Sequence, residues 1–418
     1  MSQYFSFQWH ITDECDQRCK HCYIFSGDGC KKLRSMTWKG MQEVVANCED
    51  FCRVYHKTPY FYITGGDPIL HPDFWKLMVL LKSKDIPFTL MGNPFHLNDE
   101  ICRMLKVCGC EKYQMSLDGM KKTHDWFRKP GSFDETLEKV GCLNRAGIKS
   151  VIMSTVSRTN QEEIPDIIDA VVKAEVNVYA FSRYVPTGGE VDEKMTPEEY
   201  RNLLKICDAK FKAYEAAGCK TYFNKKDHLW TLYEYETGQF LLPSHGKKDM
   251  IYDGCNCGNC HITISSNGDV MACRRVMDSK VANIFEDRLS DVWICQMEKY
   301  REYDKFVKCS KCELKPWCRG CPAVANGTNG SFYAKDPQCW KTKNEIKRTA
   351  LIIYLSSFFI SFFSAAFVFA HSSTQYSIKC RTMHTEPIGT KDQKIHSGQF
   401  NTKVRFWLAS CANTLSIP

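Results

Sequence analysis

The first fourteen residues contain polar and acidic groups and no long apolar run. A secretory signal peptide needs such a run, so this stretch predicts a protein that stays in the cytoplasm. The chain also has little excess charge of either sign. Its formal net charge is +8 over 418 residues, and residues 349–418 carry +4 of that charge. An excess this small does not indicate binding to nucleic acid.

Cysteine, by contrast, is abundant, with 24 in the chain. A cysteine-rich chain without an export signal is more typical of proteins that bind metals or iron–sulfur clusters than of disulfide scaffolds. The spacing of the cysteines therefore decides what they can hold, and two regions of the chain have ligand-like spacing.

The first region has Cys15, Cys19 and Cys22 in C-x3-C-x2-C spacing, directly after a strand-like run at Phe5–Thr12. Three such thiolates can bind three irons of a 4Fe–4S cube and leave the fourth iron open for chemistry. The alternatives are buried structural cysteines or a zinc site, although zinc usually takes two C-x2-C-like pairs. The run resembles the radical SAM signature, in which the open iron chelates the amino and carboxylate groups of S-adenosylmethionine. His21 stands where that signature usually has an aromatic residue.

Alternating strand-like and helix-like segments follow, and six such units predict an α/β fold with a parallel sheet and right-handed crossovers. The expected strands are Phe5–Thr12, Pro59–Ile63, Phe88–Met91, Lys112–Leu117, Ser150–Val156 and Asn177–Tyr184. The expected helices are Thr37–His56, Pro72–Lys84, Asn98–Cys108, Phe133–Ala146, Gln161–Glu175 and Pro197–Ala217. A complete barrel needs eight units. The resemblance therefore implies a partial (β/α)6 TIM-type barrel that is open on one side for substrate.

The second strand runs into Gly65, Gly66, Asp67 and Pro68. Two glycines let a backbone come close to a ligand, although the same four residues can also be a simple turn. At this position they resemble the GGEP motif of the radical SAM family, whose backbone holds the amino group of the methionine moiety. The aspartate is one methylene shorter than the family's glutamate.

Further cofactor contacts are expected where later strands end, because functional groups of such folds collect at the C-terminal ends of strands. The fourth strand ends at Ser116 and Asp118, and Arg128 follows. This stretch resembles the S-x-D-G…H-D-x-x-R motif of SPASM-type radical SAM enzymes, which implies that these residues meet the ribose or carboxylate of the cofactor. Ser154 and Arg183, at the next two strand ends, are further candidates for cofactor binding. The alternative is that they are satisfied locally.

The second region has nine cysteines, with a G-x4-C unit before a C-x2-C-x5-C-x2-C run. They are Cys255, Cys257, Cys260, Cys273, Cys309, Cys312, Cys318, Cys321 and Cys339. The pattern resembles the SPASM domain, which carries two auxiliary 4Fe–4S clusters, except that the family has x3 before the fourth cysteine of the run. Paired zinc knuckles have similar local spacing and are the alternative.

The resemblance also implies how the second region would divide between the two clusters. One cluster would take Cys255 or Cys257, and the sequence does not decide between these two. Its other ligands would be Cys260, Cys273 and Cys321. The second cluster would take Cys309, Cys312, Cys318 and Cys339.

The expected domain order is a barrel over 1–218, a bridge over 219–252, a SPASM domain over 253–345 and a tail over 346–418. Within the tail, residues 349–370 carry no formal charge. As a helix they would span about 33 Å, enough to cross a bilayer. Basic residues before them would keep the catalytic domains on the cytoplasmic side. A disordered or atypical tail is the alternative to this membrane anchor.

Taken together, the resemblance implies a radical SAM/SPASM enzyme that reductively cleaves S-adenosylmethionine and uses the resulting 5′-deoxyadenosyl radical. Its expected substrate is a ribosomally made peptide that contains cysteine, joined by a thioether or carbon–carbon cross-link. A flavodoxin or ferredoxin would supply electrons. Oxidation of a protein Cys or Ser, as in anaerobic sulfatase maturation, is the enzymatic alternative. A non-enzymatic zinc protein that binds partners is the alternative from another class.

Overall fold

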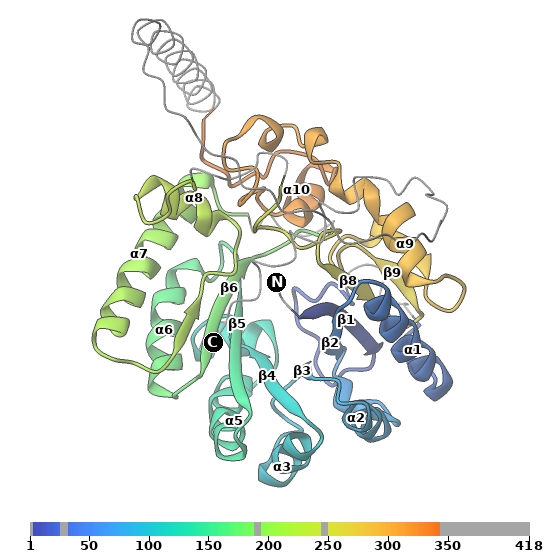
Figure 1. The fold of residues 1–418 in the computed structure, drawn as a ribbon. Coiled ribbons are helices and arrows are strands. Elements are labelled where there is room, and N and C mark those ends of the chain that lie inside the picture. The colour runs from blue at the N-terminus through green and yellow to red at the C-terminus, as the bar shows by residue number, and fades with distance from the viewer. Residues whose placement is uncertain (1–2, 26–31, 188–193, 244–249, 343–418) are drawn as a thin grey trace, which may run out of the picture. The chain divides into compact units, whose positions relative to one another are not determined.

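The computed structural model describes residues 3–25, 32–187, 194–243 and 250–342. Its central element is a ten-stranded sheet in the order β10-β9-β8-β1-β2-β3-β4-β5-β6-β7. Strands β1 to β7 are all parallel to their neighbours, and the helices that connect them lie outside the curved sheet (Figure 1). The predicted α/β class is therefore confirmed, and each of the six predicted strand–helix units is present.

The bounds of the elements follow the predicted ones to within a few residues. The parallel strands are β1 Tyr4–Thr12, β2 Thr58–Gly65, β3 Phe88–Met91, β4 Cys110–Ser116, β5 Lys149–Val156, β6 Val178–Arg183 and β7 Tyr222–Asn224. The helices around them are α1 Trp38–Val54, α2 Phe74–Ser83, α3 Asp99–Val107, α4 Lys121–Phe127, α5 Ser132–Ala146, α6 Ile164–Lys173, α7 Pro197–Ala216 and α8 Leu229–Glu236. Strand β7 and helix α8 form a seventh unit in the stretch expected to be a bridge.

Helix ends follow ordinary capping chemistry. The Asn98 side chain accepts a hydrogen bond from the Ile101 amide at 2.8 Å and so caps α3. At α7, Thr196 and Glu199 form a reciprocal capping box, with Pro197 at the first helical position. Each contact satisfies backbone N–H groups that a helix start leaves without partners.

The cysteine-rich region continues the barrel sheet. Strand β8, His261–Ile264, pairs in parallel with β1, so that Ser6 lies opposite His261. Strands β9, Asp269–Met271, and β10, Lys280–Asn283, follow in antiparallel order. Eight parallel strands therefore run from β8 to β7, which is two more than the sequence predicted. The described residues up to Trp340 belong to one compact unit.

Aromatic side chains bind this region to the barrel. Phe5 on β1 packs 4.6 Å from Phe51 on α1 and 5.2 Å from Trp293 on α9, Leu289–Cys295, measured between ring centroids. All three side chains are buried. Burial of large aromatic surfaces is a strong apolar contribution to stability, so the cysteine-rich region and the barrel share one core.

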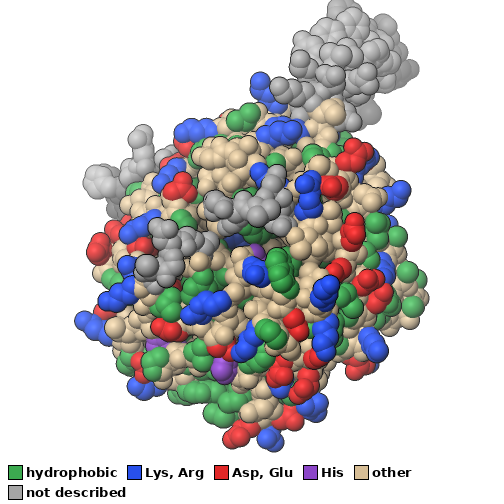
Figure 2. Space-filling model, turned by 180° about the vertical axis from the view of Figure 1, so that it is seen from behind, with side chains coloured by type: hydrophobic (Ala, Val, Ile, Leu, Met, Phe, Trp, Pro, Cys, Tyr) green, Lys and Arg blue, Asp and Glu red, His purple; other side chains and the backbone are tan. Residues whose placement is uncertain are grey.

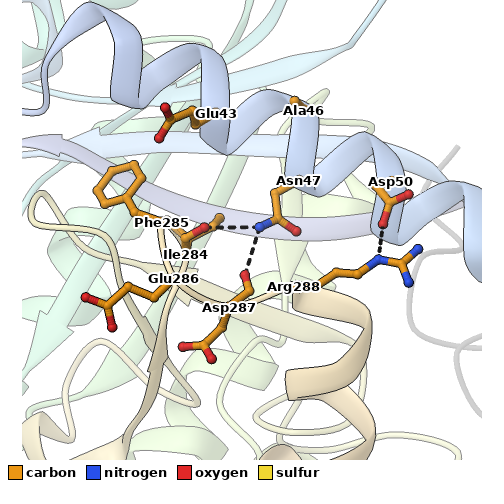
Figure 3. A pocket seen from close by; sticks show the side chains of 9 residues that line it. All are labelled: Glu43, Ala46, Asn47, Asp50, Ile284, Phe285, Glu286, Asp287 and Arg288. Carbon is orange, nitrogen blue, oxygen red and sulfur yellow. Dashed lines mark hydrogen bonds and ion pairs between the residues drawn. The ribbon is translucent and has the colours of Figure 1, made fainter.

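A polar contact supports the same junction (Figure 3). The Asn47 amide nitrogen on α1 donates to the carbonyl oxygens of Ile284 at 3.1 Å and Asp287 at 3.0 Å. Its amide oxygen accepts from the Leu289 backbone N–H at 3.0 Å. Arg288 forms an ion pair with Asp50 one turn further along α1, at 2.7 Å. The shallow groove beside these residues therefore lies where α1 packs against residues 284–288 of the same chain.

The expected membrane helix at 349–370 lies outside the described residues. Among the residues that the structure describes, no helix combines the length and the apolar character needed to cross a bilayer.

Candidate active site

The loop after β1 brings Cys15, Cys19 and Cys22 together. All three are free and partly buried. Burial raises the pKa of each thiol, and nearby cysteines of the group raise it further. Bound iron would replace the thiol protons, so three converging free thiols are a donor set that fits a cluster with one open iron.

Several donors already face these sulfur atoms. The Asn93 side-chain nitrogen lies 3.4 Å from the Cys15 sulfur, and the Gln17 backbone N–H lies at the same distance. The Arg128 guanidinium lies 3.7 Å from the Cys19 sulfur. Positive and N–H groups around thiolates stabilise their negative charge, so this shell favours the deprotonated ligands that iron needs.

The two glycines after β2 pack against the cysteine loop itself. A Cβ at Gly65 would lie 2.1 Å from the Thr12 carbonyl oxygen, and one at Gly66 would lie 2.0 Å from that of Glu14. At the same place the Gly66 N–H donates to the Thr12 carbonyl and the Asp67 N–H to that of Glu14, at 2.8 and 2.7 Å. The glycines therefore hold the start of the cysteine loop close to β2.

The environment of the Asp67 carboxylate would favour a positively charged partner. Its side chain is fully buried. Neither carboxylate oxygen has a hydrogen-bond partner among the described residues. Burial, reinforced by the charge of Asp16, raises the pKa of Asp67 to about 7. An ammonium group placed here would satisfy the carboxylate, which fits the predicted binding of a cofactor amino group in this loop.

Asp118 and Arg128, both expected to contact the cofactor, form an ion pair with each other. The Arg128 Nε donates to Asp118 at 2.6 Å. The Thr155 backbone N–H donates to the other carboxylate oxygen at 2.7 Å, and the His21 ring nitrogen lies 3.4 Å away. The positive charges of Arg128 and His21 outweigh burial and lower the pKa of Asp118. This fully buried aspartate thus orients Arg128 toward Cys19, and direct cofactor contacts by either residue stay a prediction.

The other residues expected to bind the cofactor differ in whether their side chains already have hydrogen-bond partners in the protein. Ser116 has no side-chain hydrogen-bond partner among the described residues. Ser154 is buried, and its hydroxyl donates to the Leu117 carbonyl at 2.5 Å. Arg183 donates to Asp227, Asp336 and Gln338 at 2.7–3.0 Å. Ser154 and Arg183 are thus satisfied by the protein, which was the alternative for strand ends.

The later cysteines gather in two groups. In one, the Cys257 thiol is hydrogen-bonded to Cys255 and Cys273, which raises the pKa of Cys257 and lowers those of its two partners. Cys321 interacts electrostatically with Cys255. Cys260 lines the same cavity as these four cysteines. Because Cys255 and Cys257 both join this group, the competition between them as ligands stays open.

The second group brings together the four cysteines expected for the second auxiliary cluster. The negative charges of Cys312 and Cys339 raise the pKa of Cys309, after burial as the main cause. Burial, followed by the charges of Cys309, Cys339 and Cys312, raises the pKa of Cys318. Lys308 lies 3.2 Å from the Cys339 sulfur. Four sulfurs from one compact loop region form a closed donor set, as a four-cysteine cluster needs.

A small apolar core holds two cysteines of the first group in place. Val185, Val276, Ala323 and Val324 pack together, with Cys273 and Cys321 against them. Helix α10, Pro322–Asn329, starts directly after Cys321. This core links the end of the barrel to the thiols.

One cavity of about 560 Å³ connects the barrel interior with these thiols. Inward-facing residues of β1, β2, β4, β6 and β7 line its barrel side, and most of them are polar. They are Ser6, Gln8, Tyr62, Gln114, Ser182 and Asn224. The other side is lined by the cysteines of the first SPASM group, Cys255, Cys257, Cys260, Cys273 and Cys321. A molecule in this cavity would therefore contact the barrel wall and the cysteine-rich region together.

Comparisons with known proteins support this geometry. Residues 9–171 match the family model of the radical SAM superfamily, and residues 255–322 match that of an iron–sulfur cluster-binding domain named SPASM. The first range contains Cys15, Cys19 and Cys22, and the second contains eight of the nine later cysteines, all except Cys339.

The chain belongs to the radical SAM superfamily.

It is a radical SAM enzyme with a SPASM domain, and its cofactors are 4Fe–4S clusters and S-adenosylmethionine. The alternative of a non-enzymatic zinc protein is therefore wrong. Charges of both signs are interspersed among the described residues on the face in Figure 2, where they form no continuous basic stripe.

The names of this enzyme's relatives indicate different substrates. An AdoMet-dependent heme synthase of Nitratidesulfovibrio vulgaris is 26% identical over 346 residues, covering 79% of this chain and 90% of the relative. The sporulation killing factor maturation protein SkfB of Bacillus subtilis is 23% identical over 285 residues, covering 68% and 63%. The crystal structure of Streptococcus suis SuiB bound to precursor peptide SuiA has a TM-score of 0.63 at 19% identity, covering 82% and 77%. The family is thus clear, whereas the substrate is not.

Sequence reasoning missed several residues of this site. Asp336 accepts two hydrogen bonds from Arg183, 153 residues away. Lys226, Arg274 and Arg275 line the cavity. Arg274 and Arg275 directly follow Cys273, and this position beside a predicted ligand was the one sequence feature that could have drawn attention to them. Lys226 lies in a stretch without any pattern.

Proposed function

We propose that this radical SAM/SPASM enzyme modifies a ribosomally made peptide, with a thioether or carbon–carbon cross-link as the product. The observation that carries the proposal is the continuous cavity between the barrel wall and the thiols of the first SPASM group. A peptide segment entering it would lie between the barrel wall and one place suited to an iron–sulfur cluster. The names of SkfB and SuiB, which both concern peptide substrates or products, support the same substrate class.

The protein's own residues would hold the cofactors and shape the reaction space. Cys15, Cys19 and Cys22 would bind the cluster with the open iron, and Asp67 would meet the cofactor's ammonium group. When bound, the cluster and S-adenosylmethionine supply a radical that abstracts a hydrogen atom from an unreactive carbon. The barrel wall would orient the substrate and exclude water from the reaction. A flavodoxin or ferredoxin would deliver the electron.

The SPASM thiols would hold two further clusters. Cys309, Cys312, Cys318 and Cys339 would bind one of them. The other would take Cys273, Cys321 and Cys260, with either Cys255 or Cys257. These clusters could accept an electron from the product or bind a substrate thiol.

Anaerobic reconstitution tests the proposal. The protein should bind about twelve irons per chain, as three four-iron clusters require, and should form 5′-deoxyadenosine from S-adenosylmethionine. The triple variant C15A/C19A/C22A should lose that product while it keeps the auxiliary irons. A cysteine-containing candidate peptide should lose the mass of two hydrogen atoms. Cleavage of S-adenosylmethionine without any change in peptide mass would count against the peptide substrate.

Oxidation of a protein Cys or Ser, as in sulfatase maturation, is the enzymatic alternative with the same cofactors. It differs in its product, because a sulfatase-derived peptide would gain an aldehyde and no cross-link. Trapping with a hydrazide reagent therefore distinguishes the two outcomes in the same assay.

A tetrapyrrole substrate is a second candidate, because one specific observation favours it. Three cationic side chains that have no acidic partner among the described residues line the cavity: Lys226, Arg274 and Arg275. Tetrapyrroles of the heme type carry propionate carboxylates, and the heme synthase relative covers most of this chain. Anaerobic incubation with iron coproporphyrin III would test it, since loss of carbon dioxide from a propionate changes the product mass. An unchanged porphyrin would exclude this candidate.

A further inference from the structure

The cavity contains a group of three positive charges. Lys226 follows β7, and Arg274 and Arg275 follow β9 and Cys273. Their side chains form no ion pair and no hydrogen bond with any described residue. The Arg274 Nε is buried without a partner. Lys226 is exposed and the two arginines are half-buried, so water reaches the group. Three neighbouring like charges without counter-ions nevertheless repel one another, and an anionic ligand would relieve that repulsion.

The acids that line the cavity do not neutralise this group. Asp227 forms an ion pair with Arg183 at 3.0 Å. Asp253 accepts from the Gly254 backbone N–H at 2.7 Å. The charges that act on Lys226 are those of Arg274 and Arg275, and both are positive.

His261 shows the same excess of positive charge. It lies on β8 and lines the cavity. The charges of Arg274 and Lys226 act on its ring, and one ring nitrogen, Nε2, lies 3.2 Å from the Thr263 hydroxyl oxygen. The cavity thus presents an ammonium, two guanidinium groups and an imidazole.

A bound auxiliary cluster would account for only part of this charge. Arg275 interacts with Cys321 and Cys273, so an anionic cluster there would compensate it. Lys226 has no such interaction with a cysteine. Arg274 points its guanidinium over the ring of Tyr23, 5.8 Å from the ring centre, and Tyr23 directly follows Cys22. Lys226 and Arg274 are therefore available to a different anion.

We infer that Lys226 and Arg274, assisted by Arg275, bind a carboxylate group of the substrate. The inference rests on the proposed function only in placing the substrate in this cavity. A planar guanidinium gives a carboxylate two parallel hydrogen bonds, and a nearby ammonium adds a third donor. Because Arg274 lies beside Tyr23, a carboxylate held here would anchor the substrate between the first cysteine loop and the SPASM thiols.

Two sources offer this chemistry: an acidic or C-terminal carboxylate of a peptide, or a propionate of a tetrapyrrole. The test therefore uses two pairs of probes with the anaerobically reconstituted protein. One pair is coproporphyrin III and its tetramethyl ester. The other is a capped Ala-Glu-Ala tripeptide and the same peptide with glutamine. Binding is measured by fluorescence for the porphyrins and by calorimetry for the peptides.

The variants are Lys226→Gln and Arg274→Gln, with Lys225→Gln as the matched control. Lys225 is the adjacent residue, but its ammonium is paired with Asp208 and Glu234 at 3.0 and 2.8 Å. In at least one pair the carboxylate form should bind about tenfold more tightly than its neutral form, as a charged hydrogen bond allows. Lys226→Gln and Arg274→Gln should each remove most of that preference, whereas Lys225→Gln should keep it.

The pair that shows the preference identifies the source of the carboxylate. Equal binding of charged and neutral forms in both pairs would overturn the inference. So would a preference that survives in Lys226→Gln and Arg274→Gln, or variants that lose auxiliary iron but not binding, since the cations would then serve the cluster. Formation of 5′-deoxyadenosine is recorded on the same samples. Its absence would count against the proposed function and leave the binding result unaffected.

Discussion

The guanidinium of Arg183 and the carboxylate of Asp336 form a buried, two-pronged ion pair. The Nη1–Oδ1 distance is 2.7 Å and the Nη2–Oδ2 distance is 2.9 Å, and both side chains are almost inaccessible to solvent. The same carboxylate accepts a hydrogen bond from the Cys321 backbone N–H at 2.8 Å. The last long strand of the barrel thereby fixes the backbone of a predicted cluster ligand.

Asp336→Asn should therefore destabilise the protein strongly. The change leaves part of the Arg183 charge unpaired in a buried site, which typically costs about 3–5 kcal/mol. We expect a loss of that size in the free energy of unfolding, together with a lower auxiliary iron content. Denaturant titration and iron analysis measure the two effects.

An exposed ion pair provides the control for Asp336→Asn. Asp134 pairs with Lys121 on the surface, where both side chains are more than half exposed. Asp134→Asn should cost less than about 1 kcal/mol, as exposed pairs do. Equal losses in the two variants would show that the buried pair has no special role.

Gly66→Ala should impair the cluster with the open iron. The added Cβ would lie 2.0 Å from the Glu14 carbonyl oxygen, so the loop that carries Cys15 would have to move. We expect about four fewer irons per chain after reconstitution, the content of one cluster, and a corresponding loss of 5′-deoxyadenosine formation.

Gly141→Ala on α5 is the matched control for this steric effect. Its nearest neighbour would be the flexible end of Arg145 at 3.2 Å, and alanine is the better helix former by about 1 kcal/mol. This variant should keep all its iron. Full iron content in Gly66→Ala would mean that the loop adapts and that the glycine is not needed there.

The sequence predicted those parts of the fold that depend on local pattern. Buried strands such as Phe88–Met91 and amphipathic helices such as α7 can be recognised in the sequence from their periodicity and capping residues. Strand β7 was missed because it has only three residues, Tyr222–Asn224. Strand β8 was missed as part of the barrel sheet because its pairing with β1 joins residues about 250 positions apart, and no local pattern encodes such a contact.

The same distinction holds for the site. Spacing was enough to single out the cysteines, because their chemistry depends on short intervals along the chain. It was not enough for Arg183, whose acidic partners Asp227 and Asp336 come from distant segments. The cations Lys226 and Arg274 likewise meet only in the folded cavity. Roles that depend on the charge balance of a folded site therefore needed the structure.

Asn47→Ala should weaken the junction between α1 and the SPASM region. The amide makes three hydrogen bonds to backbone groups across this junction, and those to Ile284 and Asp287 are drawn in Figure 3. Its removal leaves these groups unsatisfied, which costs about 1–3 kcal/mol for each one that water cannot reach. Thermal unfolding should show a lower midpoint than in Glu43→Ala, a change at an exposed residue of the same helix. Equal midpoints would show that the aromatic core alone holds the junction.

Asp67→Asn should change how stability depends on pH in the absence of S-adenosylmethionine. The pKa of Asp67 is raised from 3.8 to about 7, mainly by burial. The folded state therefore binds the proton more tightly than the unfolded state does. Asp67 should cost stability progressively as the pH rises from about 4 to about 7, with a total of a few kcal/mol at most and a constant cost above that range.

The asparagine variant lacks this titration, so it should gain stability relative to the wild type between pH 5 and pH 8. Denaturant midpoints of both proteins at several pH values in this range measure the difference, with Asp134→Asn as the control. A difference that stays constant with pH would contradict a raised pKa. Added S-adenosylmethionine should then stabilise the wild type more than the variant at pH 8, because its ammonium group would compensate the Asp67 carboxylate and lower the pKa of that group again.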